Sequence, residues 1–302
     1  MDYWTVSVNH MTIAADSFVF NLDPVLIRLG PVQIRYYGAI FALTLLISLV
    51  LWRRQMRRGG YPPRAADGLI VWGVLAVIVG ARLGHFLFYN PRIFIEDPLT
   101  VLQYWRGGLA SHGAMIGMLI ALILYARHLR RPVLEIVDRF AFSAAVGSAG
   151  IRLGNFLNSE IVGRPTDLPW AVVFARYDHL PRHPSQLYEF AMGLAVLAVL
   201  VWVDRRAGRE NRPLGLLTGV WLTGYFAGRL GVEFVKEYQG LGPEYVLTTG
   251  QFLSIGPLLA GLALLLWVRR HPRPTSSLPR PAAAQEDKKQ PHHKGHRGRR
   301  AH

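Results

Sequence analysis

A group of polar side chains lies between residues 148 and 164, directly after an apolar stretch of the chain. It combines the guanidinium of Arg152, the carboxamides of Asn155 and Asn158 and the carboxylate of Glu160 with several glycines. Ionisable groups near membrane depth usually face a protein interior or a wet cavity and carry a function. The planar fork of an arginine can donate two parallel hydrogen bonds to a phosphate. These residues therefore predict a site for a phosphate-bearing lipid that enters from the bilayer.

A second arginine, Arg229, occurs near the end of another apolar stretch, with Tyr225 and Glu233 at helical spacing on either side. Two arginines from different helices could hold one phosphate between them and stabilise the charge that develops on a leaving phosphate ester. Glu233, four residues after Arg229, could orient its guanidinium. The alternative is structural: Arg152 and Arg229 could reach lipid headgroups or form ion pairs with Glu160 and Glu233.

Three further residues are candidates for the same pocket. His112 follows a glycine pair near the start of an apolar stretch. Its imidazole can take up a proton near neutral pH, although a hydrogen-bonded helix-cap histidine is the alternative. Tyr37 could bind a phosphate or a hydroxyl group, but aromatic residues at the ends of spans are ordinarily interfacial anchors. Arg82 could line the pocket or form a structural ion pair with Glu189 or Asp138.

The polar residues of the first stretch also have a local explanation. Asparagine favours turns and helix caps, so Asn155, Asn158 and Glu160 could shape the chain rather than position a ligand. Gly163, three residues after Glu160, is expected to form a turn. Whether these residues position a ligand or shape a turn, they lie where the chain leaves an apolar stretch.

Seven apolar stretches could carry these residues across a bilayer, whose core needs roughly 20 apolar residues. They cover residues 36–52, 68–89, 109–125, 132–153, 186–203, 214–235 and 251–268. The sequence therefore predicts an all-α polytopic membrane protein with seven transmembrane helices between residues 36 and 270. Residues 1–35 are expected to form an extracytoplasmic lead-in with a short interfacial helix. The polar segment 156–184 is expected to form a small extracytoplasmic subdomain with a short strand at 170–174, and the basic cytoplasmic tail 271–302 is expected to be disordered.

The formal net charge of +15 is concentrated in particular loops. Arginines cluster after the first, third, fifth and seventh apolar stretches, and cytoplasmic loops carry such an excess. This predicts a multi-pass protein of the bacterial cytoplasmic (inner) membrane with its N-terminus outside and its C-terminus in the cytoplasm. Residues 91–108 are expected to rest at the headgroup level. The charge does not line one aromatic-rich face, so nucleic-acid binding is not predicted.

The chain contains no cysteine. This excludes disulfides, thiolate metal sites and a cysteine nucleophile within the protein, so any thiol chemistry must use a thiol of a substrate. The sequence also lacks the glycine-rich phosphate loop, the zinc-binding HExxH motif and the GxSxG nucleophile elbow. It has no acidic cluster suited to Mg²⁺. No metal and no organic cofactor is therefore predicted.

Several separated motifs resemble those of the prolipoprotein diacylglyceryl transferase family. The most specific is the run 152–160 followed by Gly163 and Arg164. Similar blocks occur in the family's order at residues 36–38, 80–84, 111–113, 183–189 and 225–229. The resemblance covers about residues 22–268. The chain departs from the family pattern at Ile151, where the family usually has glycine, and at Arg35, where many members have histidine.

This resemblance implies an enzyme that passes the diacylglyceryl group of phosphatidylglycerol to the lipobox cysteine thiol of a prolipoprotein. A thioether forms and glycerol phosphate leaves. The implied catalytic residues are His112, Arg152 and Arg229. His112 would either assist deprotonation of the thiol, because a thiolate is the nucleophile, or orient the headgroup. The implied substrate-binding residues are Tyr37, Arg82, Arg152, Asn155, Asn158, Glu160, Gly163, Tyr225 and Glu233. The implied partners are phosphatidylglycerol, membrane lipids and the signal peptide of the prolipoprotein.

Two other classes also fit the residues taken alone. A transporter or flippase for an anionic lipid would need inward-facing arginines as well. It would further need two alternating gates, and the sequence shows no repeat strong enough to suggest them. A non-catalytic membrane scaffold would use the basic tail to recruit a partner.

Overall fold

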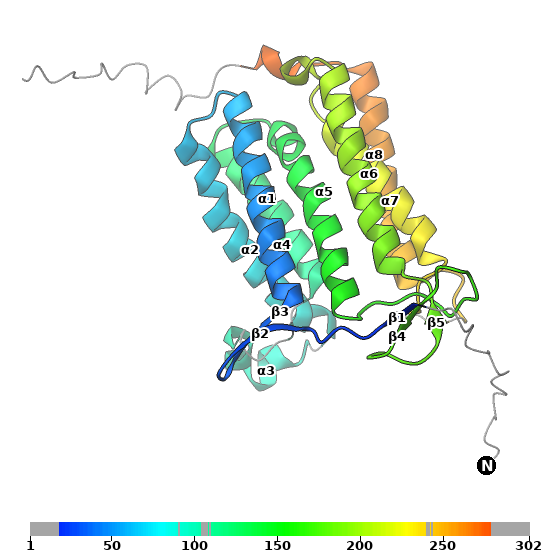
Figure 1. The fold of residues 1–302 in the computed structure, drawn as a ribbon. Helices are drawn as coiled ribbons and strands as arrows, with labels where there is room; N and C mark the ends of the chain where they lie inside the picture. Colours follow the sequence, from blue (N-terminus) through cyan, green and yellow to red (C-terminus); the bar gives the residue numbers. More distant parts are fainter. Residues whose placement is uncertain are drawn as a thin grey trace, which may run out of the picture. The chain divides into compact units, whose positions relative to one another are not determined.

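The computed structural model describes residues 18–89, 91–103, 108, 110–239, 242 and 244–278. Seven long helices occur among them (Figure 1): α1 (Tyr36–Arg58), α2 (Pro63–Tyr89), α4 (Ser111–His128), α5 (Val133–Leu157), α6 (Ser185–Arg206), α7 (Leu216–Glu233) and α8 (Thr249–Arg270). Each overlaps one predicted apolar stretch, which confirms a mostly helical, polytopic architecture. In the described part of the chain, α1, α2, α6 and α8 are long and apolar enough to cross a membrane, and α4 is a shorter apolar helix. Helices α5 and α7 contain the polar residues singled out above.

The chain forms two compact units, and it passes from one to the other within α1, within α5 and after Arg273. The first consists of Met1–Leu51 and Phe140–Arg273, and the second of Trp52–Arg139 and Pro274–His302. Most of the predicted site residues belong to the first unit, whereas Arg82 and His112 belong to the second.

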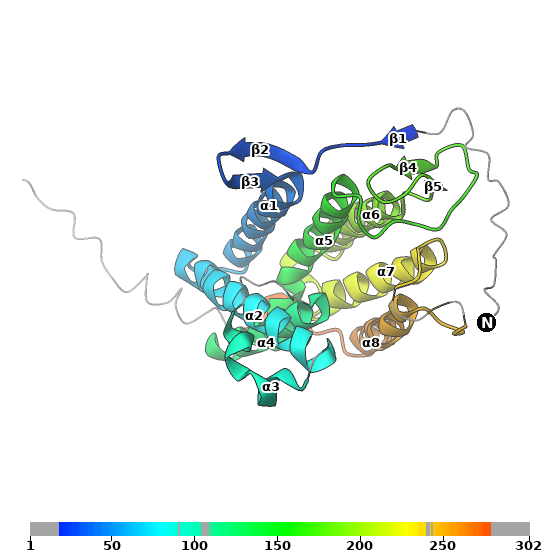
Figure 2. The ribbon, with the colours of Figure 1, turned by 90° about the horizontal axis from the view of Figure 1, so that it is seen from below.

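In the first unit, α6 packs against α5 and α7, and α7 packs against α8 (Figure 2). The buried apolar core is formed by Ala141, Phe142 and Ala145 of α5, Val196 and Leu200 of α6, and Leu217 of α7. The backbones of α1 and α5 approach closely at Gly150, because this residue has no side chain. The side chain of Thr44 occupies the space that a Cβ at Gly150 would need. Ser48 and Ser143 donate hydrogen bonds to each other's carbonyl oxygens, at 3.3 Å and 2.7 Å. Small polar residues of this kind join helices where lipid provides no hydrophobic driving force.

The polar segment after α5 contributes to a small sheet. β1 (Phe18–Phe20) pairs in parallel with β4 (Val172–Phe174), which pairs antiparallel with β5 (Pro181–Arg182). Its apolar core consists of the buried side chains of Val162, Val172 and Phe174, with Phe20 and Phe156 packed against them. The predicted strand at 170–174 is therefore confirmed in β4. The segment begins later than predicted, because α5 continues to Leu157.

The lead-in differs from the prediction where it is described. Residues 18–31 form no helix. They form β1 and, together with residues 32–35, a β-hairpin in which β2 (Val25–Leu29) pairs antiparallel with β3 (Val32–Arg35). Gly30 makes the tight turn with a φ of 59°, a conformation that glycine adopts without strain. Apart from the turn at Gly30 and Pro31, apolar and polar residues alternate from Ile27 to Arg35 with the period of a strand, a signal that is too short to count as a membrane-length apolar run.

The second unit is built on α2 and α4. Glycines at i and i+4 on both helices, Gly80 and Gly84 facing Gly113 and Gly117, let the two backbones touch; a Cβ on Gly113 would lie 2.1 Å from the Gly80 carbonyl oxygen. Residues 91–108, which are predicted to rest at the headgroup level, contain α3 (Ile93–Glu96) and the 3₁₀ helix η1 (Pro98–Leu102). The aromatic residues Tyr104 and Trp105 of this segment lie outside the described residues.

The predicted disordered tail is described only as far as residue 278. Within this part, Thr275–Ser277 form a 3₁₀ turn, η4, and Thr275 is buried. This beginning of the tail is therefore ordered. The rest of the predicted tail lies outside the described residues.

Candidate active site

Two arginines from different helices meet at one buried carboxylate. Arg152 Nε of α5 lies 3.1 Å from Oε2 of Glu189, and Arg229 Nη1 of α7 lies 3.4 Å from Oε1 of the same side chain. Glu189 stands in the second turn of α6 and is only 1% exposed, whereas the two arginine side chains retain 13% and 18%. A ligand that reaches this point therefore meets guanidinium groups before it meets the carboxylate. The structural alternative predicted from the sequence was an ion pair of these arginines with Glu160 and Glu233, not with Glu189.

Lys236 adds a third cation, which is not among the site residues predicted from the sequence. Its Nζ lies 3.5 Å from Glu189 Oε2 and 3.5 Å from Glu233 Oε1, and its side chain is 2% exposed. Burial lowers the pKa of Lys236, and the carboxylates of Glu189 and Glu233 only partly oppose this effect. The sequence carried one signal for this residue, because Lys236 follows Glu233 by three positions, the spacing of a helical ion pair.

The carboxamides predicted from the first stretch connect Arg152 to Glu160. Asn155 accepts a hydrogen bond from Arg152 Nη1 at 3.5 Å and donates one to Glu160 Oε2 at 3.3 Å, and Asn158 donates to the other oxygen of Glu160. The chain reverses here because Ser159 takes a left-handed conformation with a φ of 55°. This turn brings the exposed carboxylate of Glu160 back towards the end of α5.

Two tyrosines lie beside the same arginine. The ring of Tyr37 lies against Gly154, where a Cβ would be 2.9 Å from the ring, and it is within electrostatic range of Arg152 and Glu160. The Tyr225 side chain lies against the Arg152 guanidinium. Phenol hydroxyls can donate to or accept from a polar headgroup, so both tyrosines could contact a ligand held by Arg152.

Gly163 does not form the predicted turn. Its N–H donates to the His183 carbonyl oxygen at 3.0 Å, and it pairs with Lys236 as an isolated antiparallel bridge. A Cβ at this position would lie 2.4 Å from that oxygen and 2.8 Å from the Val235 carbonyl oxygen. A glycine is needed because three backbone segments converge at this position. Their convergence fixes the position of Lys236, whose side chain reaches Glu189 and Glu233.

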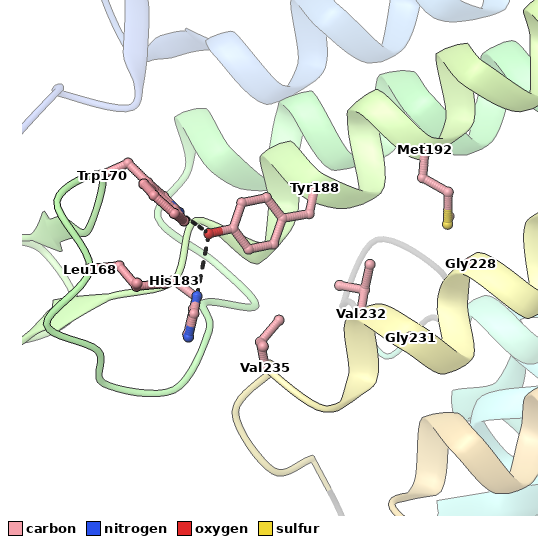
Figure 3. A pocket seen from close by; sticks show the side chains of 9 residues that line it. All are labelled: Leu168, Trp170, His183, Tyr188, Met192, Gly228, Gly231, Val232 and Val235. Atoms are coloured by element: carbon pink, nitrogen blue, oxygen red, sulfur yellow. Dashed lines mark hydrogen bonds between the residues drawn. The ribbon is translucent and has the colours of Figure 1, made fainter.

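A groove of about 570 Å³ lies between α6, α7 and the segment that follows α5 (Figure 3). It is lined by Leu168, Trp170 and His183 of the loop, Tyr188 and Met192 of α6, and Gly228, Gly231, Val232 and Val235, which belong to α7 and its C-terminal extension. Arg229 and Glu189 are the direct chain neighbours of two of these lining residues. The lining is almost entirely apolar and therefore suits a hydrocarbon chain.

One end of the groove carries a small hydrogen-bonded group. Trp170 Nε1 donates to the Tyr188 hydroxyl oxygen at 2.7 Å, and that hydroxyl lies 3.3 Å from His183 Nδ1 (Figure 3). Burial lowers the pKa of His183. In the tautomer that is unprotonated at Nδ1, the neutral imidazole accepts a hydrogen bond from the Tyr188 hydroxyl, which holds the Tyr188 ring in the groove wall.

Arg82 and His112 belong to the second unit. Arg82 is buried and donates to the carbonyl oxygens of Thr100 (2.6 Å), Val101 (3.0 Å) and Gly108 (3.3 Å), with its guanidinium 4.5 Å from the Phe86 ring centroid. These contacts hold the η1 loop against α2. His112 is the second residue of α4, and its side chain lies outside the described residues.

The cluster around Glu189 is suited to one anion. Three buried or half-buried cations, Arg152, Arg229 and Lys236, face two carboxylates, Glu189 and Glu233, which leaves an excess of one positive charge. In a site of low dielectric such an excess attracts a monoanion strongly. Among the described residues, no group of three or more histidines and carboxylates is arranged to hold a metal ion.

Comparison with known proteins assigns the chain to a family. The sequence model of the family described as prolipoprotein diacylglyceryl transferase matches residues 24–267. The chain is similar to proteins named phosphatidylglycerol–prolipoprotein diacylglyceryl transferase from several bacteria. It is 41% identical to that of Nitrosomonas europaea over 257 residues (83% of this chain, 91% of the relative). It is 40% identical to that of Cupriavidus necator over 269 residues (86% and 97%) and 42% identical to that of Tolumonas auensis over 249 residues (82% and 96%).

Proposed function

The chain belongs to the prolipoprotein diacylglyceryl transferase family, and on this premise we propose that it transfers the diacylglyceryl group of phosphatidylglycerol to the lipobox cysteine of a prolipoprotein. The substrate sulfur forms a bond to the glyceryl carbon that carries the phosphate. The bond between this carbon and the phosphate oxygen breaks, and its electron pair leaves with glycerol phosphate. The products are a thioether and a phosphomonoester. The comparisons give no support to the alternative of a lipid flippase.

The convergence of Arg152 and Arg229 on one carboxylate carries this proposal. A phosphodiester has one negative charge, and the phosphomonoester that leaves has up to two. Donors that are already in place where charge develops stabilise the transition state more than the ground state. Arg152, Arg229 and Lys236 supply these donors, and Glu189 keeps the three cations together before the lipid arrives.

The polar residues next to Arg152 are proposed to orient the headgroup. Asn155, Asn158 and Glu160 offer both donors and acceptors, as the two hydroxyl groups of a glycerol require. Tyr37 and Tyr225 border the same guanidinium.

The groove between α6 and α7 is proposed to hold an acyl chain of the lipid. Its lining is almost entirely apolar and includes Tyr188 and Gly228, the chain neighbours of Glu189 and Arg229, which makes it the proposed place for a chain of a lipid whose headgroup binds these cations. The lipid would then arrive sideways from the bilayer. The seven long helices are proposed to cross the inner membrane with the N-terminus outside, and the segment after α5 is proposed as an extracytoplasmic subdomain.

His112 is proposed to assist removal of the thiol proton, a role that rests on the family resemblance alone. The His112→Gln variant tests it through the pH dependence of kcat/KM. Loss of the rising acidic limb of that profile is expected, because glutamine cannot take up a proton. A full rate with an unchanged profile would leave His112 without this role.

The main test uses a lipobox peptide and phosphatidylglycerol, with mass spectrometry of the thioether product. Arg152→Ala should lower kcat/KM by about 100-fold or more, the usual loss for one preorganised donor. Arg152→Lys should also lose activity, because an ammonium is a point charge without a planar fork. Arg28→Ala is the matched control, since this arginine is 62% exposed and pairs with Asp23 away from the cluster. Wild-type rates in Arg152→Ala would refute the phosphate clamp.

A further inference from the structure

The β2–β3 hairpin separates its apolar and polar side chains. Leu29 pairs with Val32 and Ile27 pairs with Ile34, so these four apolar residues occupy one face of the hairpin. Arg28 pairs with Gln33 on the opposite face. We call the first set the apolar face.

No described part of the protein covers the apolar face. Leu29 and Val32 are 60% and 59% exposed, and Ile27 and Ile34 are 46% and 39% exposed. An isolated two-stranded hairpin is marginally stable in water, and contiguous exposed apolar residues mark an interaction site. These side chains therefore form a surface that is open to a partner beyond the described residues.

The position of the hairpin identifies what covers it. β3 runs directly into α1 at Tyr36, and α1 itself exposes apolar side chains, among them Phe41 (40%), Leu45 (50%) and Leu46 (57%). Helix α1 is long and apolar enough to cross a membrane. The hairpin turns away from the axis of α1 rather than extending it (Figures 1 and 2). It therefore lies where α1 meets the surface of the bilayer.

The opposite face and the strand edges limit how deeply the hairpin can insert into the bilayer. Arg28, paired with Asp23 at 2.8 Å, together with Gln33 and Arg35 supplies polar groups suited to phosphate headgroups and water. The outer edges of a two-stranded sheet also present backbone N–H and C=O groups, which the hydrocarbon core cannot satisfy. Such an amphipathic element rests in the interface with its apolar side chains at the acyl boundary.

We propose that the apolar face of the β2–β3 hairpin is a monotopic lipid-binding surface that inserts into the leaflet at the N-terminal end of α1. The hairpin and α1 then anchor the start of the first unit from two directions. This surface is independent of the proposed transferase function, because it uses none of the residues assigned to the headgroup site.

The absence of cysteine from the chain makes a clean test possible. Single-cysteine variants Val32→Cys and Gln33→Cys, adjacent in β3 but on opposite faces, are labelled with an environment-sensitive fluorophore. The full-length protein is then reconstituted in phosphatidylcholine–phosphatidylglycerol vesicles. The probe at Val32 should emit further to the blue than the probe at Gln33. It should also be quenched more by lipids brominated near the headgroup and less by aqueous iodide.

Equal iodide quenching at the two positions, with no preference for brominated lipid, would overturn the proposal. Protection of the Val32 probe that appears only when a lipobox peptide is added would also overturn it, since a protein would then be the occupant. Photolabelling of the unsubstituted chain by a diazirine-bearing lipid checks the same surface without mutation. Label in the peptide spanning residues 25–35 supports the proposal, and its absence there contradicts it.

Discussion

The role of Glu189 as the carboxylate shared by three cations leads to the most informative prediction. Glu189→Gln keeps the size and shape of the side chain but removes its charge. Arg152 Nε at 3.1 Å, Arg229 Nη1 at 3.4 Å and Lys236 Nζ at 3.5 Å then lose their common partner. Only Glu233 remains to balance three neighbouring cations.

The expected destabilisation is large because the carboxylate is 1% exposed. Removing one partner of a buried ion pair costs about 3–5 kcal/mol, since the remaining charge stays buried without compensation. For a chain of this size that corresponds to a fall on the order of 10 °C in apparent melting temperature. Burial already lowers the pKa of Lys236 in the wild type. If Lys236 loses its proton in the variant, the loss of stability will be smaller.

The assay compares melting in detergent with added phosphatidylcholine or phosphatidylglycerol. Because the phosphate of phosphatidylglycerol can supply the missing negative charge, the anionic lipid should restore more stability to the variant than to the wild type. Glu237→Gln is the control. Its carboxylate pairs with Arg182 but is 31% exposed, so its removal should cost no more than about 1 kcal/mol.

The reasoning fails if Glu189→Gln melts at the wild-type temperature. It also fails if the variant responds equally to the two lipids, because the cations would then not be available to an anionic headgroup. An equal loss of stability in Glu237→Gln would show that general damage to the loop, rather than the buried charge, causes the effect.

Two further predictions concern the segments around the cluster. Because burial lowers the pKa of Lys236, the unfolded chain binds more protons than the folded one between that lowered pKa and the ordinary 10.5, so wild-type stability should rise with pH across this window. Lys236→Met should flatten the rise in a melting series, and an unchanged slope would contradict the assignment. Gly163→Ala should cost about 1–3 kcal/mol, because its Cβ would lie 2.4 Å from the His183 and 2.8 Å from the Val235 carbonyl oxygen. The control Gly147→Ala, with nothing within 4 Å of the new Cβ, should be neutral or stabilising, and equal melting temperatures for the two variants would refute the close approach.

The comparison of Glu189 with Arg152 shows where sequence reasoning reached its limit. Arginine near the end of an apolar stretch is conspicuous, because a charge at that depth requires a reason. Glu189 was noted only as a possible partner of Arg82, since a carboxylate close to the start of a span is common at helix ends. Its position at the centre of the ion cluster depends on how α5, α6 and α7 pack, which spacing along one helix does not reveal.

The amino-acid sequence by itself determined the seven helices and the motifs that assign the family. Apolar length is a local property, and each motif is contiguous, so both are readable without knowledge of the fold. Only the tertiary structure decided that Arg152 and Arg229 share Glu189, that Lys236 completes the cluster and that Gly163 permits a backbone crossing. The physical reason is that these contacts join residues 37 to 73 positions apart, and chain spacing carries no information about which helix faces meet.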